Sequence, residues 1–408
     1  MDYEMGGGAE RRLRVLFSRI GDVLGNARRR ASFAAYALGL LSEGERKSME
    51  PIASRTCGDP DETGAIHERL QHFVTESEWD DRAVRRVAHR HALSAMDKRE
   101  RIHTWIVDDT GFLKQGTHSV GVQRQYTGSA GKTANCQVGV SLSVATPTEH
   151  VPVDFELYLP KSWTEDSARR KEARIPDDVG FKTKPELALD MIRRAADDEI
   201  PFGVLLADSA YGDSSEFREE VRFLGLNYAV GIHSPTKIWC VDTLDRRYGE
   251  PLSVRDLALE IRRDNGFRRV TWREGTKASL SSSFALRRVL PFHQDSWDAA
   301  EREVVWLLIE WPEGEAEPTD FHFATLPLNT TTKRLVRVVK ERYRTERMYE
   351  DFKGELGLDH FEGRRFRGWH HHVSVALCCF AFVVAERVRT FSPQTRWQES
   401  DDAIACSP

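Results

Sequence analysis

Three acidic positions stand out because each follows, or lies within, a segment that the sequence predicts to be buried. Asp108 and Asp109 come directly after a short apolar run, and Asp208 comes after a second one. Glu346 lies in a segment with helical periodicity. Mg²⁺ prefers oxygen ligands, and a few carboxylates that converge at strand ends suit a two-metal site acting on phosphates. The sequence therefore predicts that these carboxylates form a site for Mg²⁺ or Mn²⁺.

The segment that holds Glu346 has one face defined by alternating spacings of three and four. The members of this face are Leu335, Val339, Arg342, Glu346, Tyr349, Lys353 and Leu356. We expect one long helix that begins at Thr332 and points Glu346 toward the core. A buried carboxylate without a partner costs several kcal/mol, so Glu346 should be ion-paired or bind a metal. Arg342 and Lys353 could balance its charge or bind DNA phosphates. The alternative is a simple Arg342–Glu346 pair on the flank of a helix.

Composition limits the class of protein. The chain has 408 residues, more than one compact domain usually holds, so two or three structural units are expected. Its formal net charge of −5 gives no overall sign of nucleic-acid binding, so any basic surface must be local. Its six cysteines have no spacing that resembles a zinc site or a disulfide framework. The first eight residues lack the pattern of a signal peptide, and the longest apolar run, Val373–Val384, is too short to span a membrane. These features favour a cytoplasmic protein.

The N-terminal region, residues 1–98, is predicted to be helical because its apolar residues recur at spacings of three and four. Arg28, Arg29 and Arg30 form a basic group in this region. Two interpretations of the group stay open: a solvated face of a helix, or contacts with DNA phosphates.

Strand patterns begin after this helical region. Alternation of apolar and small residues predicts an antiparallel meander of three strands: Ile102–Val107, Ser119–Tyr126 and Gln137–Ala145. A helix and two further strands follow: Leu187–Ala196, Phe202–Ala207 and Asn227–Gly231. The predicted α/β region carries Asp108 at its first strand and Asp208 at its fourth.

A charged, β-rich segment separates Asp208 from Glu346. Its predicted strands are Phe267–Trp272, Ser281–Val289 and Glu303–Trp311, after which Phe321–Thr325 returns to the first sheet. We interpret residues 233–320 as an insertion. The expected organisation is a helical region over 1–98, a core over 99–232, the insertion over 233–320, and a second part of the core over 321–408.

Several stretches resemble motifs of the DDE transposases of bacterial insertion sequences, in the group with a β-rich insertion before the catalytic Glu. They are Val107–Lys114, Gln123–Tyr126, Glu156–Trp163, Gly180–Lys184 and Glu355–Arg364, and they span residues 102–372. The order of strands and helices is that of a ribonuclease H-like domain, in which the first and fourth strands are neighbours. The resemblance implies an α/β, ribonuclease H-like catalytic domain with a β-rich insertion, preceded by a helical N-terminal DNA-binding domain.

By this resemblance, Asp108, Asp208 and Glu346 would be the catalytic and metal-binding triad. The family signature around the Glu has the form Tyr-x₂-Arg-x₃-Glu-x₆-Lys. Arg342, Glu346 and Lys353 match it, and a valine, at position 339, stands where the signature has Tyr. The departure concerns the tyrosine and leaves the triad intact.

The same resemblance implies DNA as the partner, both as element ends and as target, with a homodimer when two ends are brought together. Such a protein would be associated with the nucleoid when bound to DNA. Residues predicted to contact DNA are Arg28, Arg29, Arg30, Lys132, Arg342 and Lys353.

The implied chemistry is an in-line displacement at phosphorus. One metal ion would activate water or a DNA 3′-hydroxyl, and the other would stabilise the leaving 3′-oxygen, so one site could cut and join. Two alternatives stay open: a domesticated or inactive DNA-binding protein, and a metal-dependent nuclease without strand transfer. An assay for strand transfer separates the transposase from the nuclease.

Two local expectations complete the sequence analysis. Successive residues of a strand point to opposite faces, so only one of Asp108 and Asp109 should face Asp208. We expect Asp108 to be the ligand, with Asp109 beside it or exposed. The run His370–His372 is expected at the surface, where it could contact DNA phosphates, rather than in a metal site.

Overall fold

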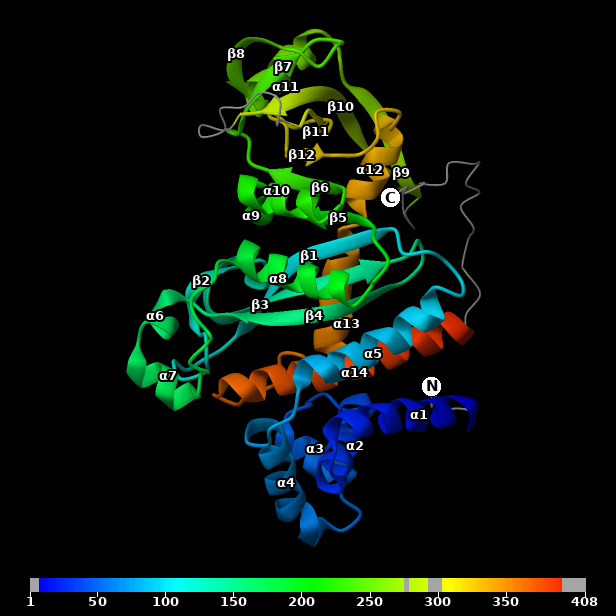
Figure 1. The fold of residues 1–408 in the computed structure, drawn as a ribbon, viewed down its shortest axis with the longest axis vertical. Coiled ribbons are helices and arrows are strands. Elements are labelled where there is room, and N and C mark those ends of the chain that lie inside the picture. Colours follow the sequence, from blue (N-terminus) through cyan, green and yellow to red (C-terminus); the bar gives the residue numbers. More distant parts are fainter. Residues whose placement is uncertain (1–6, 275–278, 293–302, 391–408) are drawn as a thin grey trace.

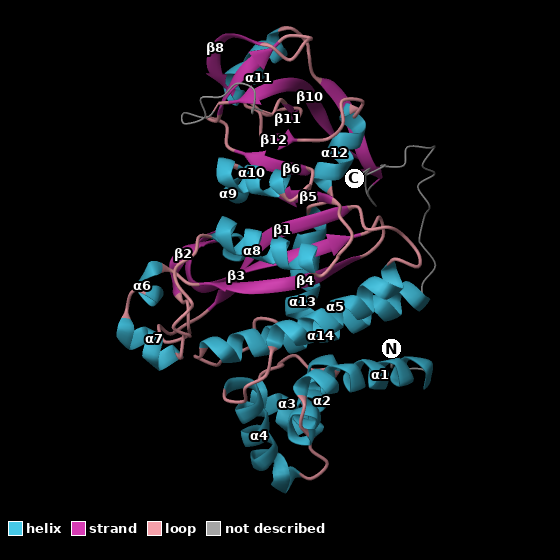
Figure 2. Ribbon diagram, in the orientation of Figure 1, coloured by secondary structure: helices cyan, strands magenta, loops and turns pink. Residues whose placement is uncertain are grey.

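The computed structural model describes residues 7–274, 279–292 and 303–390, and it has a mixed α/β fold (Figure 1, Figure 2). The described strands form one continuous sheet with the order β2-β3-β1-β5-β6-β12-β11-β10-β7-β8. Two further strands lie off this path, because β4 pairs with β3 and β9 pairs with β10. The predicted α/β class is confirmed.

The part of the sheet that carries both aspartates contains β1 (Thr104–Leu113), β3 (Lys132–Ala145), β4 (His150–Tyr158), β5 (Val204–Ala207) and β6 (Tyr228–Ile232). β1 runs antiparallel to β3 and parallel to β5, and β5 runs parallel to β6. The predicted order of the meander was wrong. β1 pairs directly with β3, and β2 (Gln123–Thr127) forms a hairpin with the beginning of β3. The strand that completes the meander is β4, which we did not predict.

Helices cover both faces of this part of the sheet (Figure 1). One face is covered by α8 (Lys184–Asp197), α9 (Ser209–Gly212) and α10 (Ser215–Phe223). Two short helices, α6 (Lys161–Thr164) and α7 (Ser167–Ala173), lie beside β2 at the end of the sheet (Figure 1). α8 begins with a capping box, in which the Thr183 side chain accepts from the Glu186 backbone N–H and Glu186 accepts in return. Proline in its first turn further favours a helix start. This cap fixes the position of Lys184, the first residue of the helix.

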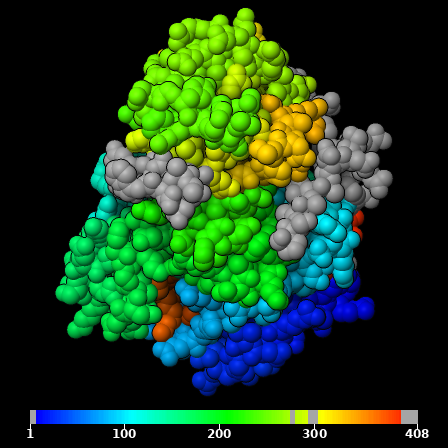
Figure 3. All heavy atoms as spheres, turned by 45° about the horizontal axis from the view of Figure 1, so that its top comes forward, coloured from blue at the N-terminus to red at the C-terminus, as the bar shows by residue number. Residues whose placement is uncertain are grey.

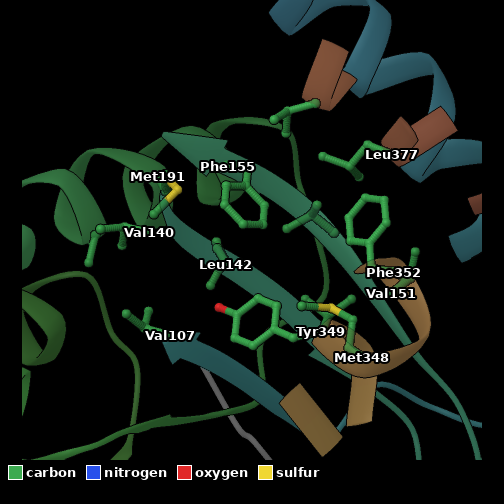
Figure 4. Packing of buried hydrophobic residues seen from close by; sticks show 14 of the residues in the cluster. Val107, Val140, Leu142, Val151, Phe155, Met191, Met348, Tyr349, Phe352 and Leu377 are labelled. Atoms are coloured by element: carbon green, nitrogen blue, oxygen red, sulfur yellow. The ribbon is translucent and has the colours of Figure 1, made fainter. Parts of the chain in front are cut away.

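The opposite face is covered by α13 (Tyr343–Leu356) and α14 (Phe366–Thr390). Figure 4 shows the buried side chains that join these helices to the sheet, among them Tyr349 and Phe352 of α13, Leu377 of α14 and Phe155 of β4. α14 contains the apolar run Val373–Val384, and it is buried over most of its length. No helix in the described ranges combines the length and apolar character needed to cross a bilayer.

Between β6 and β12 the chain builds the other end of the sheet. The elements are β7 (Lys237–Val241), β8 (Arg247–Ser253), α11 (Val254–Arg263), β9 (Arg268–Glu274), β10 (Ser279–Pro291), β11 (Val305–Trp311) and β12 (Asp320–Ala324). The three strands predicted here correspond to β9, β10 and β11, whereas β7, β8 and α11 were not predicted. β12 pairs antiparallel with β6, so this region extends the sheet. In the space-filling view it lies at the end of the molecule opposite the blue N-terminal helices (Figure 3).

The single long helix predicted from Thr332 is wrong. The structure has α12 (Thr332–Lys340) and then α13, with a turn at Glu341 and Arg342. α12 packs on β6, β9, β10 and β11, whereas α13 packs on β1, β4 and α14. The chain turns because its two apolar faces are buried against different parts of the sheet.

The N-terminal helices are α1 (Gly7–Leu24), α2 (Ala27–Leu41), α3 (Met49–Thr56), the 3₁₀ turn Pro60–Glu62, α4 (Thr63–Thr75) and α5 (Asp81–Met96). α5 lies alongside α14, and α1, α2 and α4 also contact that helix (Figure 1). The expected placement of His370–His372 at the surface was wrong, because all three are buried. His371 Nδ1 lies 2.9 Å from the Val74 carbonyl, and His372 Nδ1 lies 2.9 Å from the Tyr36 hydroxyl.

Candidate active site

Asp108 and Asp208 lie at the same edge of the sheet because their strands are parallel neighbours. Thr104 is opposite Val204 in the register of β1 and β5, and each aspartate lies four residues further along. Side chains that follow the carboxyl ends of parallel strands converge in this way. The two carboxylates are close enough that the charge of Asp208 acts on the pKa of Asp108.

Asp108 and Asp109 point to opposite faces of β1. Asp108 is opposite Ser141 in β3, and Ser141 Oγ lies 2.6 Å from the hydroxyl of Tyr349 in α13. Directly opposite residues of an antiparallel pair share a face, so Asp108 lies on the α13 side. Asp109 instead accepts hydrogen bonds from Lys184 Nζ of α8 at 2.9 Å and from the Tyr211 hydroxyl of α9 at 3.2 Å. The two adjacent acids therefore have different partners.

Arg342, at the turn before α13, joins the acids. Its Nη1 donates to Asp108 Oδ2 at 2.6 Å, and its Nη2 donates to Glu346 Oε1 at 3.3 Å. Its charge also acts on the pKa of Asp208. The Arg342 guanidinium thus contacts Asp108 and Glu346, and its charge reaches Asp208.

The sequence predicted that Glu346 points into the core, and this prediction was wrong. Its side chain is 65% exposed. The turn at Arg342 reorients α13, whose buried face is formed by Thr345, Met348, Tyr349, Phe352 and Leu356. The carboxylate of Glu346 therefore lies at the rim of the site, whereas the two aspartates lie inside it.

Asp108 is buried and Asp208 is half-buried, and the pKa of each is raised despite the positive charges nearby. Burial, together with the neighbouring Asp208 carboxylate, raises the pKa of Asp108 to about 7, although Arg342 acts in the opposite direction. Burial also raises the pKa of Asp208. Burial opposes the charge of Arg342 as well, but the surrounding carboxylates outweigh it and raise the pKa of the guanidinium. The site would therefore be stabilised by a further cation.

Comparison with known proteins identifies the family. The family model described as DDE superfamily endonuclease matches residues 19–279, which is more than half of the chain. The chain belongs to this family. A probable transposase for insertion sequence element IS701 from Microchaete diplosiphon is 30% identical over 240 residues. That alignment covers 58% of this chain and 58% of the relative, so the chain spans little more than half of the relative's length.

These comparisons confirm the resemblance read from the motifs. The match to the DDE superfamily endonuclease model includes Asp108, Asp208 and Lys184, and it ends before Arg342 and Glu346. Assignment of Glu346 therefore depends on its position in the fold and on the signature that it shares with Arg342.

DDE superfamily enzymes generally use divalent metals. The carboxylate oxygens of Asp108, Asp208 and Glu346 are the donors that Mg²⁺ and Mn²⁺ prefer. Within the described ranges, however, no three His, Cys, Asp or Glu side chains lie close enough together to hold an ion. Arg342 makes the contacts to Asp108 and Glu346 that a cation would make. The donor chemistry fits a metal, whereas the arrangement would fit one only after Arg342 moves.

Lys353, predicted to contact DNA, is used inside the protein. Its ammonium donates to Thr110 Oγ1 at 2.7 Å, to the Gly111 carbonyl at 2.8 Å and to Ser129 Oγ at 3.0 Å. Burial lowers the pKa of Lys353. These contacts favour a structural role, in which Lys353 holds the end of β1 against the turn before β3.

The other predicted DNA contacts lie nearer to solvent. Lys132 is exposed at the start of β3. In the first turn of α2, Arg28 is exposed, Arg29 donates to Ser77 Oγ at 3.1 Å, and Arg30 lies 3.6 Å from an aspartate of α1. Positive charge at a helix N-terminus opposes the helix dipole, and no acid in this turn compensates for it.

Sequence reasoning missed three residues that hold the site together. Tyr349 is the tyrosine that contacts Ser141, and both it and Tyr211 have a pKa raised well above the usual value by burial and nearby aspartates. Lys184 lies in a motif quoted for the family resemblance, but its partner, Asp109, is 75 residues away in sequence. For Tyr349, the sequence signal was its place on the same predicted helix face as Glu346.

Proposed function

We propose that this DDE endonuclease is a transposase that cuts DNA at the ends of an insertion sequence and joins those ends to target DNA. The observation that carries the proposal is the convergence of Asp108 and Asp208 just beyond the paired residues of two adjacent parallel strands, with Arg342 linking Asp108 to Glu346. A carboxylate group of this kind suits metal-assisted phosphoryl transfer. The membership of the chain in the DDE superfamily supports the same activity.

We further propose that the catalytic core is ribonuclease H-like. The spatial order β4-β3-β1-β5-β6 supports this assignment, because β1 is central and has an antiparallel neighbour on one side and a parallel one on the other. The proposed organisation is an N-terminal DNA-binding domain over 1–98, a core over 99–232 and 321–408, and a β-rich insertion over 233–320.

Asp108, Asp208 and Glu346 would hold Mg²⁺ or Mn²⁺, which when bound supply a nucleophile at neutral pH and stabilise the leaving oxygen. The surrounding residues position these acids. Asp109 ties the end of β1 to α8 through Lys184, and it ties β1 to α9 through Tyr211. Asp208 is the N-cap residue of α9, and its Oδ1 accepts a hydrogen bond from the Ala210 backbone N–H at 3.0 Å. Both aspartates are thereby held at the same edge of the sheet.

We assign to Arg342 a role that depends on DNA. A guanidinium binds phosphate with the same two-pronged geometry that it uses for carboxylates. A DNA phosphate entering the site would therefore compete with Asp108 for Arg342. Transfer of Arg342 to the phosphate would leave the acids with uncompensated negative charge, which favours cation binding. DNA and metal binding would then reinforce each other.

The remaining predicted DNA contacts fit a partner with a continuous phosphate backbone. Lys132 and Arg28 are exposed, and they lie on separate parts of the chain. Replacing one cationic side chain that binds a phosphate of duplex DNA lowers the slope of log affinity against log salt by about 0.9. Two copies of the protein would be needed to hold two element ends at once.

The test uses the full chain with a DNA fragment that carries the inverted repeats flanking its gene, and a supercoiled plasmid as target. Cleavage at the repeats in Mg²⁺, followed by joined products in the plasmid, would support a transposase. Cleavage without joining would indicate a nuclease, and binding without cleavage would indicate an inactive DNA-binding protein. Glu350→Gln is the matched control for a substitution of Glu346, since Glu350 is an exposed acid on the same helix. It should leave cleavage unchanged.

A further inference from the structure

A long stretch without acids follows Asp109. Residues 110–148 contain no Asp or Glu, although the chain has 64 acidic residues in 408, a density at which this stretch would contain about six. The same stretch contains Lys114, Arg124 and Lys132. A local basic segment in an acidic chain is expected where the surface meets a polyanion.

The β2–β3 hairpin, residues 123–136, presents an aromatic side chain within this stretch. Tyr126 is 67% exposed on β2. Arg124 is also exposed, and because residues two apart on a strand share a face, it lies on the same side as Tyr126. Lys132 is exposed where β3 begins. An exposed ring with a guanidinium beside it can stack on a nucleic-acid base while the charge contacts the backbone.

The hairpin is firmly attached to the strand of Asp108. Gly111 N–H donates to Ser129 Oγ at 3.3 Å, and Ser129 also accepts from Lys353 Nζ at 3.0 Å. The Thr127 side chain packs on Gly111 so closely that a Cβ there would lie 2.0 Å from Thr127 Oγ1. Tyr126 is thus presented from a fixed backbone, so binding would order few additional groups.

These attachments also limit the distance between Tyr126 and the acids. Ser129 Oγ lies 3.1 Å from Thr110 Oγ1, and Thr110 is two residues from Asp108, or roughly 7 Å along a strand. Tyr126 is three residues from Ser129, or at most about 11 Å of chain. At about 3.4 Å per nucleotide along one strand, Tyr126 lies within about seven nucleotides of a phosphate at the site.

We propose that the β2–β3 hairpin binds the DNA strand next to the phosphate to be cut, with Tyr126 stacked on an unpaired base. Arg124 and Lys132 contact the backbone on either side of that base. This inference rests on the proposed function, because it takes DNA as the substrate of the acids. It goes further by assigning a binding surface and the DNA structure that it selects, which is a locally unpaired strand.

The experiment measures DNA binding by the full chain in EDTA, by fluorescence anisotropy. The probes are a single-stranded 16-mer of thymidine, a duplex with six unpaired nucleotides at one end, and the same duplex fully paired. Tyr126→Ala is expected to weaken binding of the first two probes about tenfold and of the third much less. Tyr126→Trp should restore binding. Arg124→Gln and Lys132→Gln should each lower the salt slope on the single strand by about 0.7.

Tyr248→Ala is the matched control, because Tyr248 is 58% exposed on β8, at the other end of the sheet. Equal affinity of wild type and Tyr126→Ala for all three probes would overturn the inference. The inference would also be overturned if Tyr126→Ala changed the sedimentation of the protein but not its DNA binding. That result would assign the surface to a protein partner. Binding needs no cleavage, so a wild-type protein that uses Tyr126 but cuts no DNA would refute only the proposed transposase.

Discussion

Two groups of charged side chains, one around Asp108 of β1 and one around Asp154 and Glu156 of β4, contain the same residue types. The negative charge of the acids is balanced differently in the two groups. The carboxylate cluster contains Asp108, Asp208, Glu346 and Arg342. The ion network contains Asp81, Arg82, Arg85, Asp154, Glu156, Arg194 and His370, and it joins α5, β4, α8 and α14. The first group has three acids and one arginine, whereas the second has three acids, three arginines and a histidine.

The acids of the ion network have short contacts with its arginines. Arg85 Nη1 lies 2.7 Å from Asp81 Oδ2, and its Nε lies 3.1 Å from Asp154 Oδ1. Arg194 Nη2 lies 2.7 Å from Asp154 Oδ2 and 2.9 Å from Glu156 Oε1. None of the network's three acids is exposed as Glu346 is. A largely buried group with several ion pairs is suited to holding helices on a sheet.

The pKa shifts of the two groups have opposite directions. Burial opposes the charge of Glu156, but contacts with His370, Arg85 and Arg194 outweigh it and lower the pKa of Glu156 well below its usual value. For Asp108, burial outweighs the single arginine and raises the pKa. The direction of the shift thus separates a structural network, whose charges are matched, from a candidate site that can accept a further cation.

The largest expected effect is the loss of DNA cleavage when an acid of the carboxylate cluster is replaced. Asp108→Asn, Asp208→Ala and Glu346→Ala should each reduce DNA cleavage at least about 100-fold, because metal ligands supply several kcal/mol to the reaction. Binding of element ends should change little, since it depends on many phosphate contacts. Gel shift and cleavage assays on the same preparations measure the two effects. An equal loss of both activities would contradict the assignment.

A substitution in the ion network should lower the free energy of unfolding and leave the rate of DNA cleavage unchanged. Glu156→Gln leaves the buried arginines short of one partner, and breaking a buried pair costs about 3 kcal/mol of unfolding free energy. Urea denaturation of wild type and variant at pH 7 measures the difference. Residual cleavage per folded molecule should stay near the wild-type value, which distinguishes the network from the cluster.

The same variant has a pH signature. The pKa of Glu156 in the folded protein lies below its ordinary value of 4.5, so folding favours the ionised form. Its contribution is therefore present above pH 4.5 and is lost as the pH falls below that value. The stability gap between wild type and Glu156→Gln should narrow between pH 5 and pH 3. A gap that stays constant would mean that the charge of Glu156 does not stabilise the fold.

The comparison also explains what the sequence could reveal. Asp108 and Asp208 were found because an apolar run precedes each of them, which is a local pattern, although β1 continues past Asp108 to Leu113. β4 was missed because Asp154 and Glu156 interrupt its apolar pattern, and their partners Arg85 and Arg194 come from helices distant in sequence. A strand that carries two acids is acceptable in the core only when those partners are present.

The break before α13 and the burial of the histidines have similar causes. No Pro or Gly marks the turn at Arg342, and the helical periodicity continues through it. The turn follows from packing of two helices on different parts of the sheet. His371 and His372 are buried because carbonyls and a tyrosine from other elements accept or donate hydrogen bonds there. Such partners cannot be read from neighbouring residues.

A smaller effect should follow when the single arginine of the cluster is removed. Arg342→Gln takes away a positive charge that competes with a metal ion for Asp108, so the DNA-free protein should bind Mn²⁺ about tenfold more tightly. Mn²⁺ binding is measured directly by electron paramagnetic resonance. Arg347→Gln is the control, because Arg347 is on the same helix and pairs with acids outside the cluster. Unchanged or weaker Mn²⁺ binding in Arg342→Gln would contradict the role assigned to Arg342.

The smallest effect tests the two adjacent aspartates of β1. Asp109→Asn keeps the shape of the side chain and one acceptor oxygen for Lys184 or Tyr211, but it removes the charge that holds the ammonium at 2.9 Å. Since Asp109 faces α8 and Asp108 faces α13, we expect Asp109→Asn to retain a measurable fraction of cleavage, roughly a tenth, as befits a positioning residue. Its Mn²⁺ affinity should stay near the wild-type value, whereas that of Asp108→Asn should fall. If Asp109→Asn is instead the inactive variant and Asp108→Asn cleaves DNA, the metal ligand lies on the α8 face of β1. Arg342 would then neutralise a structural acid, and the cluster would resemble the ion network more than it differs from it.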